Sequence, residues 1–149
     1  MLHGFDYHVD GSNSNADLVF RGGKLFGSMS NGGPTAAGDG TIYTLDLATD
    51  VLTTLYSIAG GTDGLFPVSG VVFDTNGLAY GATHQGGGSG AGTLFQINTK
   101  KLLFTTIHEF AISDGTQPGG PLLADGTGTL YGVTSGGGRG HGTIFKITP

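Results

Sequence analysis

Apolar residues in this chain fall in short runs bounded by glycine, asparagine and aspartate, a pattern typical of β-strands separated by tight turns. In the run Thr93–Asn98 the side chains alternate, with Phe95 and Ile97 on one face and Gln96 on the other. Leu94 makes the second face apolar as well, and a strand that is apolar on both faces must be covered on both. No stretch has the 3.6-residue periodicity of an amphipathic helix, so the pattern predicts an all-β fold of stacked sheets.

Three short motifs each occur three times, about 50 residues apart, and this period is typical of propeller blades and other repeat arrays. A Gly-Thr-apolar-aromatic segment recurs at 40–43, 92–95 and 142–145, an aromatic-glycine pair at 26–27, 80–81 and 131–132, and an Asp-Gly turn at 10–11, 63–64 and 114–115. In the second unit, the apolar runs predict four strands, at 69–73, 78–83, 93–98 and 102–110. Residues 1–149 are therefore expected to form a single domain, a β-propeller segment of three four-stranded blades.

The two ends of the chain are expected to complete one blade. Leu2–Phe5 aligns with Leu55–Ile58 and Ile107–Phe110, which are fourth strands, whereas residues 142–149 form a third strand. The N-terminal strand is thus predicted to complete the last blade by pairing with Gly142–Thr148. Because propellers typically have four to eight blades, we expect the ring to close by homo-oligomerisation. A homodimer with six blades is favoured, and a homotrimer with nine is the alternative.

Composition and charge exclude several classes of partner. Glycine is about three times more frequent than usual, with 31 residues, and marks turns and close contacts between strands. The net charge is −5 with only six Lys and Arg, which argues against nucleic acid because its binding requires a basic surface. Cysteine is absent, so neither a disulfide nor a thiolate metal site is available. No apolar run approaches the ~20 residues that insert into a membrane, and no signal peptide precedes the repeats.

Residues 130–138 and 140–149 carry the motif by which the chain resembles a known family. They read Leu-Tyr-Gly-Val-Thr-Ser-Gly-Gly-Gly and Gly-His-Gly-Thr-Ile-Phe-Lys-Ile-Thr-Pro, and residues 55–64 add an aromatic strand followed by Gly-Gly-Thr-Asp-Gly. This pattern resembles the GloVer tandem repeat over nearly the whole chain, most weakly at Phe26–Met29 in the first unit. The resemblance implies a bacterial, extracellular or cell-surface β-propeller. It implies no settled activity and no catalytic residues.

Two sets of side-chain oxygens are candidate cation sites. The turn aspartates Asp10, Asp63 and Asp114 recur at equivalent places, and an inward ring of them would bind a cation or sugar hydroxyls. Their recurrence in every unit favours a turn-forming role instead. The second set is a run of hard oxygen ligands of the kind that Ca²⁺ prefers: Asp10, Asn13, Asn15 and Asp17. It lacks the spacing of an EF-hand, so a polar surface loop with no bound ion is the favoured interpretation.

The candidate ligand-binding or catalytic side chains lie in or beside the glycine-rich loops and in the N-terminal segment: His84, Gln85, Arg139, His141 and Tyr7. His84 and His141 stand where other units carry serine or small residues, and departures from a repeat are where individual sites arise. A histidine, a tyrosine and an arginine together can abstract a proton beside a sugar carboxylate, as in a polysaccharide lyase. Loop histidines without a role are the favoured alternative, and His3 and His108 are expected to be packing or edge residues.

Three functions stay open. The glycine-rich loops are not phosphate cradles, because each precedes a strand and not the helix that a P-loop or dinucleotide site requires. The favoured function is a non-catalytic binding or scaffold module with a glycan as the candidate ligand. The alternatives are a lyase-like enzyme acting on polysaccharides and a purely structural, cut-down or engineered repeat without a ligand.

Overall fold

All strands of the protein belong to three antiparallel sheets in the computed structural model, which describes residues 1–14, 16–125 and 127–149. The first sheet contains β1 (Val19–Arg21), β2 (Lys24–Met29), β3 (Thr41–Asp46) and β4 (Val51–Ser57). The second contains β5 (Leu65–Pro67), β6 (Val72–Phe73), β7 (Ala79–Gln85), β8 (Thr93–Asn98) and β9 (Leu103–Glu109). The third contains β10 (Thr116–Ala124), β11 (Leu130–Gly136) and β12 (Thr143–Ile147).

The described residues contain one helical element, the single 3₁₀ turn η1 (Gly61–Asp63), as expected from the absence of helical periodicity. No helix in the described part of the chain is long and apolar enough to cross a membrane. The strands of the second unit lie close to their predicted positions, and β8 matches its prediction at both ends. The predicted first strand at 69–73 differs: only Val72–Phe73 of that range forms a strand, β6, and β5 lies ahead of it, with both paired to β7.

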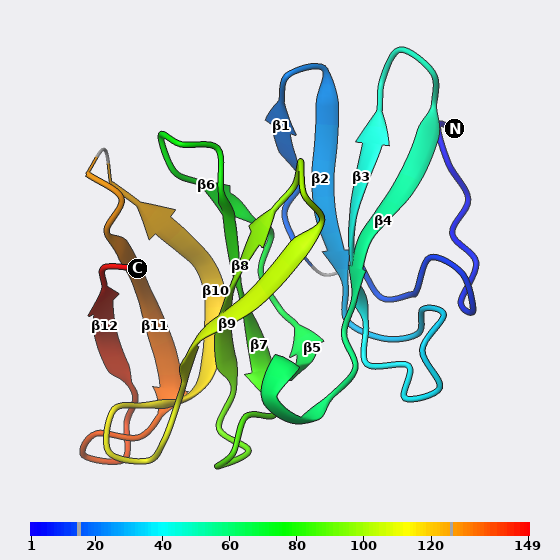
Figure 1. Ribbon diagram of the computed structural model, residues 1–149. Helices are drawn as coiled ribbons and strands as arrows, with labels where there is room; N and C mark the ends of the chain where they lie inside the picture. Colours follow the sequence, from blue (N-terminus) through cyan, green and yellow to red (C-terminus); the bar gives the residue numbers. More distant parts are fainter. Residues whose placement is uncertain (15, 126) are drawn as a thin grey trace.

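The three sheets stand side by side as a fan (Figure 1). Each is an up-and-down meander, and the last strands of the first and second sheets connect to the next sheet through an Asp-Gly turn. The connections between sheets and the glycine-rich loops all lie at the lower end of the fan in Figure 1, which we call the loop end. Each glycine-rich loop leads into a strand, as the sequence indicates.

Packing across strands explains the aromatic-glycine repeat. In every sheet the glycine of this pair lies opposite the aromatic residue of the neighbouring strand: Gly27 and Tyr43, Gly81 and Phe95, Gly132 and Phe145. A Cβ at Gly81 would lie 2.3 Å from Phe95 Cζ, closer than real Cβ contacts permit. The ring therefore fills the space that the missing side chain leaves, and the two positions depend on each other.

Apolar side chains between adjacent sheets form two separate cores. The first core joins three residues of the first sheet, Phe26, Ile42 and Leu55, to Val71, Ala79, Phe95 and Ile97 of the second unit. The second core joins Tyr80, Ala82, Ala91, Leu94 and Phe110 to Leu122 and Leu130 of the third sheet. The second sheet is thus covered on both faces, as its doubly apolar strands predict.

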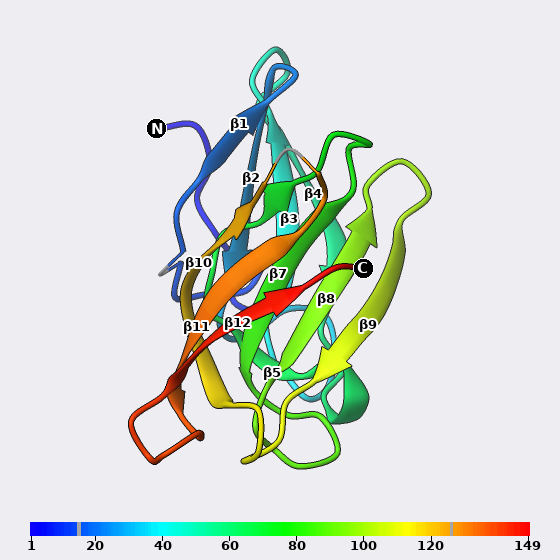
Figure 2. The same cartoon turned by 90° about the vertical axis from the view of Figure 1, so that its left-hand side faces the viewer.

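The two flanks of the fan differ from its interior. Residues 1–5 form no strand and lie against the first sheet, where the ring centroids of Phe5 and Tyr43 are 5.4 Å apart. They do not pair with β12, so the third sheet has three strands and the expected four-stranded last blade is not completed within one copy. The two termini lie on opposite flanks (Figures 1 and 2). Pairing of the N-terminal segment with another copy stays a prediction.

Candidate functional site

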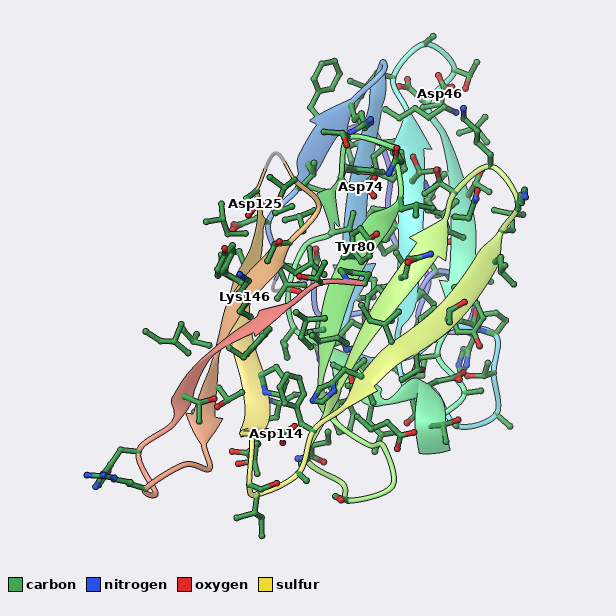
Figure 3. All side chains as sticks on the ribbon, turned by 60° about the vertical axis from the view of Figure 1, so that its left-hand side comes forward. Asp46, Asp74, Tyr80, Asp114, Asp125 and Lys146 are labelled. Carbon is green, nitrogen blue, oxygen red and sulfur yellow. The ribbon has the colours of Figure 1, made fainter. Side chains whose placement is uncertain are left out.

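A hydrogen bond from the preceding outer strand, or from the N-terminal segment in its place, holds the aspartate of each Asp-Gly turn. The distances between the bonded side-chain atoms are 2.6 Å for Tyr56–Asp63, 2.8 Å for His108–Asp114 and 2.9 Å for His3–Asp10. We call these the junction pairs, because the first two join neighbouring sheets at the loop end, where Figure 3 shows Asp114. His3 and His108, expected as packing or edge residues, thus have a defined polar partner. The sequence signal was the spacing of six or seven residues between each aspartate and an imidazole or phenol.

Threonines of the following sheet bind the main chain of the same turns. Thr93 Oγ1 donates to the Asp63 carbonyl over 3.0 Å and lies 2.9 Å from Thr83 Oγ1. The third sheet repeats both contacts, at 3.2 and 2.7 Å, with Thr143, Thr134 and Asp114. In the first sheet, Thr41 Oγ1 likewise donates to the Asp10 carbonyl. Hydrogen bonds from these threonine hydroxyls to the turn carbonyls therefore fix each turn to the sheet that follows it.

The glycine after the aspartate is required by the same close approach. Gly64 has a φ of 97°, and a Cβ there would lie 2.0 Å from Thr83 Oγ1. Gly11 and Gly115 also have positive φ, and a Cβ there would lie 2.8 and 2.6 Å from its nearest neighbour. The recurrent Asp-Gly pair thus has a structural role at the joints between units, and each of its carboxylates already has a side-chain partner.

Burial and hydrogen bonding shift the ionisation of two groups in the junction pairs. Burial raises the pKa of Tyr56 to about 12, and the hydrogen bond to the Asp63 carboxylate acts in the same direction. Burial also opposes ionisation of Asp10, but hydrogen bonds from His3 and from the Asp6 N–H outweigh it and lower its pKa below the ordinary 3.8. Asp10 is therefore charged and Tyr56 neutral at pH 7.

A second kind of aspartate contact lies at the end of the fan opposite to Asp114 (Figure 3). Tyr80 Oη donates to Asp74 Oδ2 over 3.2 Å, and the Tyr131 hydroxyl lies 3.4 Å from Asp125. Burial raises the pKa of Tyr80 to about 12, with the Asp74 charge adding to the effect. Our sequence reasoning missed this pair. The signal was an aspartate six residues before the tyrosine of the aromatic-glycine pair, and the first unit lacks it.

The described residues of the oxygen-rich N-terminal segment form no assembled cation site. The Asp10 carboxylate is occupied by its junction pair. Asn13 Nδ2 donates to Asn31 Oδ1 over 2.9 Å, and Asp17 is exposed. Asn15 lies outside the described residues. Within the parts of the chain that the structure describes, no three His, Asp or Glu side chains are grouped so as to hold a metal ion.

The five side chains considered for ligand binding or catalysis are spread over the three units. His84 and Gln85 end β7 and are half-buried, whereas Arg139 and His141 are exposed in the loop between β11 and β12. Tyr7 belongs to the N-terminal segment on the opposite flank of the fan (Figure 1). Four of the five lie in or beside the glycine-rich loops at the loop end. One copy of the chain therefore does not bring Tyr7 together with Arg139.

An apolar groove lies on the outer face of the first sheet, under the N-terminal segment, with a cavity volume of about 250 Å³. Its floor consists of Leu18, Leu25, Tyr43, Leu45 and Leu52, and its wall of Leu2, His3 and Phe5. We call it the flank groove. It is lined almost entirely by carbon, so it suits an apolar surface and offers little for a polar ligand.

Comparison with known proteins gives evidence about the fold and none about a chemical activity. No protein of curated function matches the chain in sequence. The fold resembles the extracellular domain of a putative hybrid two-component system from B. thetaiotaomicron, with a TM-score of 0.60 and 18% identity over 89% of this chain and 15% of that one. It also resembles TolB from Acinetobacter baumannii, with a TM-score of 0.58 and 17% identity over 99% of this chain and 34% of that one.

The chain thus spans at most about a third of the length of these structures. Their likeness supports a propeller-like all-β fold. The tandem motifs led to the same fold, and the profile of the Gloeobacter/Verrucomicrobia repeat matches residues 1–149 from end to end. The chain therefore belongs to the Gloeobacter/Verrucomicrobia repeat family, as its resemblance to the GloVer motif implied.

Proposed function

We propose that the chain is a non-catalytic binding or scaffold module of an extracellular β-propeller, with its ligand site at the loop end. One observation supports this assignment most directly. The polar residues that recur in every unit are bonded within the framework, at the junction pairs and their threonines. Polar residues that differ between units include Asn31, Gln85 and Gln117 at the loop end.

The loop end presents different side chains on an equivalent backbone. Asn31, Gln85 and Gly136 stand at the same register position, opposite the residue that directly follows the Asp-Gly turn of their unit. The next residue along the chain also varies between units, and it always has a positive φ: 59° at Asn13, 58° at Phe66 and 56° at Gln117. A constant backbone with variable side chains is well suited to recognition, because a binding specificity can change without disturbing the sheets.

An extracellular or cell-surface location in a bacterium is part of this proposal. The family resemblance supports it, and one of the similar structures is described as an extracellular domain. The absence of cysteine is compatible with such a location, since the framework is held by apolar cores and side-chain hydrogen bonds.

A glycan is the ligand class that we propose for the loop end. Asn31, His84, Gln85 and Gln117 supply amide and imidazole groups that donate and accept hydrogen bonds, as recognition of sugar hydroxyls requires. A glycan array identifies the ligand, and calorimetry then compares His84→Ala and Gln85→Ala with Gln96→Ala, a control on β8 away from the loops. We expect a loss of about tenfold in affinity for the first two and none for the control. An array without binding would contradict the glycan and favour the purely structural alternative.

The lyase-like alternative receives less support from the geometry. Its set of His84, His141, Arg139 and Tyr7 is divided between opposite flanks of the fan. Uronate polymers incubated with the protein provide the test, because a lyase creates double bonds that absorb in the ultraviolet. A rise in absorbance that Arg139→Ala abolishes would contradict the non-catalytic assignment.

A further inference from the structure

We propose that the flank groove is a docking surface for the exposed face of the third sheet of a second copy of this chain. The proposal rests on the propeller role proposed above and names the partner that completes the ring. It follows from a comparison within the molecule. Two complete junctions between sheets lie inside the chain, and each flank presents one half of a third.

The flank groove corresponds to the half that is covered in each internal junction. Its floor residues Tyr43, Leu45 and Leu52 are equivalent by register to Phe95, Ile97 and Phe104 of the second sheet. Phe95 and Ile97 are both 0% exposed, because the first sheet packs on them through Phe26 and Ile42. The groove therefore has the shape and chemistry of a face that receives a neighbouring sheet.

The outer face of the third sheet corresponds to the half that covers. Ile144 is equivalent to Ile42 and Leu94, which are 0% exposed within the internal junctions, yet Ile144 itself is 85% exposed. Leu123 and Val133 share this face and are 65% and 48% exposed. A contiguous apolar surface of this kind marks an interaction site.

The N-terminal segment already lies as the end of an outer strand lies on the sheet that follows it. Phe5 meets the ring of Tyr43 edge to face, with centroids 5.4 Å apart, and Phe110 meets Phe145 in the same way at 5.0 Å. The junction pair of His3 matches that of His108. The segment thus needs no rearrangement to act as the missing fourth strand, and it lacks only the sheet to which that strand belongs.

The internal junctions also fix the register of the proposed contact. Glu109 pairs with Thr93 and His108 with Leu94, so Gly4 should pair with Thr143 of the second copy and His3 with its Ile144. The Phe5 N–H should donate to the Gly142 carbonyl of that copy, as Phe110 donates to Gly92 and Ile58 to Gly40, each over 2.9 Å.

The two surfaces are complementary but different, so copies associate head to tail. Such contacts close into a ring when the rotation between copies permits. Two copies give six blades, which is within the usual range for propellers, and we therefore propose a homodimer. A homotrimer of nine blades would use the same contact. A measured trimer mass would therefore support the docking surface and change only the number of copies.

Light scattering on the intact chain gives the first test. We expect a mass of about twice 15.0 kDa for the wild type and 15.0 kDa for Ile144→Asp. Ile112→Asp is the matched control, because Ile112 is 78% exposed in the connection after β9, outside both faces, and its variant should keep the mass of the wild type. A monomeric wild type, or an oligomer that Ile144→Asp leaves intact, would overturn the proposal.

A disulfide tests the register independently, since these 149 residues include no cysteine. Residues directly opposed on neighbouring strands are close enough to be bridged. Mixing Gly4→Cys with Thr143→Cys should give a crosslinked pair under oxidation, and Gly4→Cys with Val51→Cys should give none. Crosslinks of equal yield in both mixtures would contradict the register. Neither measurement involves a glycan, so a monomer that still binds glycan would refute the docking surface alone.

Discussion

Tyr56 Oη lies 2.6 Å from Asp63 Oδ2, and the positions equivalent to Tyr56 carry His3 and His108, each bonded to its own turn aspartate. A phenol and an imidazole thus hold the turn aspartate in the same way at equivalent positions. The shared requirement is a ring at the end of an outer strand that reaches the carboxylate of the following turn. The ring can therefore be either a phenol or an imidazole.

Tyr56 and Tyr80 should lose their hydroxyl protons at a higher pH than an ordinary tyrosine. Burial raises the pKa of Tyr56 and of Tyr80 to about 12, against an ordinary value of 10.0. Because the pKa is raised in the folded state, the stabilisation by these hydroxyls is complete below pH 10 and is lost as the pH rises toward 12. When tyrosinate absorbance is followed as the pH rises, part of the increase should occur above pH 10, near pH 12. Tyr56→Phe and Tyr80→Phe should each reduce this late part of the titration. A native protein without any late component would contradict these environments.

Acid should release the N-terminal segment. The pKa of Asp10 is lowered in the folded state, so its contribution is present above pH 3.8 and disappears as the pH falls through the lower folded value. Hydrogen exchange measures this, because the N–H groups of Asp10 and Gly11 donate to the Asp6 carbonyl over 2.8 and 3.0 Å. Their protection should fall in acid. In Asp10→Asn it should be weaker already at pH 7 and nearly independent of pH, and an unchanged profile would contradict the role of the carboxylate.

A methyl group at Gly81 should destabilise the fold, because it would lie 2.3 Å from the fully buried ring of Phe95. Overpacking of this kind costs roughly 1–3 kcal/mol in the free energy of unfolding. Gly119→Ala is the control, since Gly119 also lies in a strand but its Cβ position has only an ordinary contact, 4.0 Å from the Gln117 carbonyl oxygen. Denaturant titration of the two variants should separate them, and equal midpoints would argue against the cross-strand contact.

Removing the hydroxyl of Thr93 should cost more than removing that of Thr143. Both donate to a turn carbonyl, but Thr93 is 0% exposed and Thr143 is half-buried. A buried group left without its partner costs about 1–3 kcal/mol, whereas water replaces the bond at a partly open site. Thr93→Val and Thr143→Val, compared by thermal unfolding, should rank in that order. The reverse order would contradict the idea that burial sets the cost of losing this bond.

Local sequence was sufficient for most of the strands and for the division into units, although Leu2–Phe5, predicted as a strand, forms none. The period of the motifs and the alternation around Phe95 predicted the sheets, because both reflect how residues face one another within one sheet. The prediction of the first strand at 69–73 was less accurate, since β5 lies ahead of that range and both β5 and β6 are defined by pairing with β7, which the run itself does not reveal.

Contacts between sheets could not be predicted in the same way. The partners of His3 and His108 lie six or seven residues away, but whether the rings reach them depends on how sharply the chain turns between sheets. The spread of Tyr7, His84 and Arg139 over the fan likewise follows from the packing of whole sheets. No local pattern carries that information, so the candidate site could be named by residue type but not assembled.

The fan is protected unevenly. Residues of the N-terminal segment shelter β3, whose side chains are almost all buried, whereas alternate residues of β12 are open to solvent. In repeat proteins, stability is roughly the sum of what each unit gains from its neighbours. An isolated copy should therefore fray from its C-terminal side inward, with the central sheet opening last. Its lifetime against proteases should then be governed by β12 and lengthen with protein concentration.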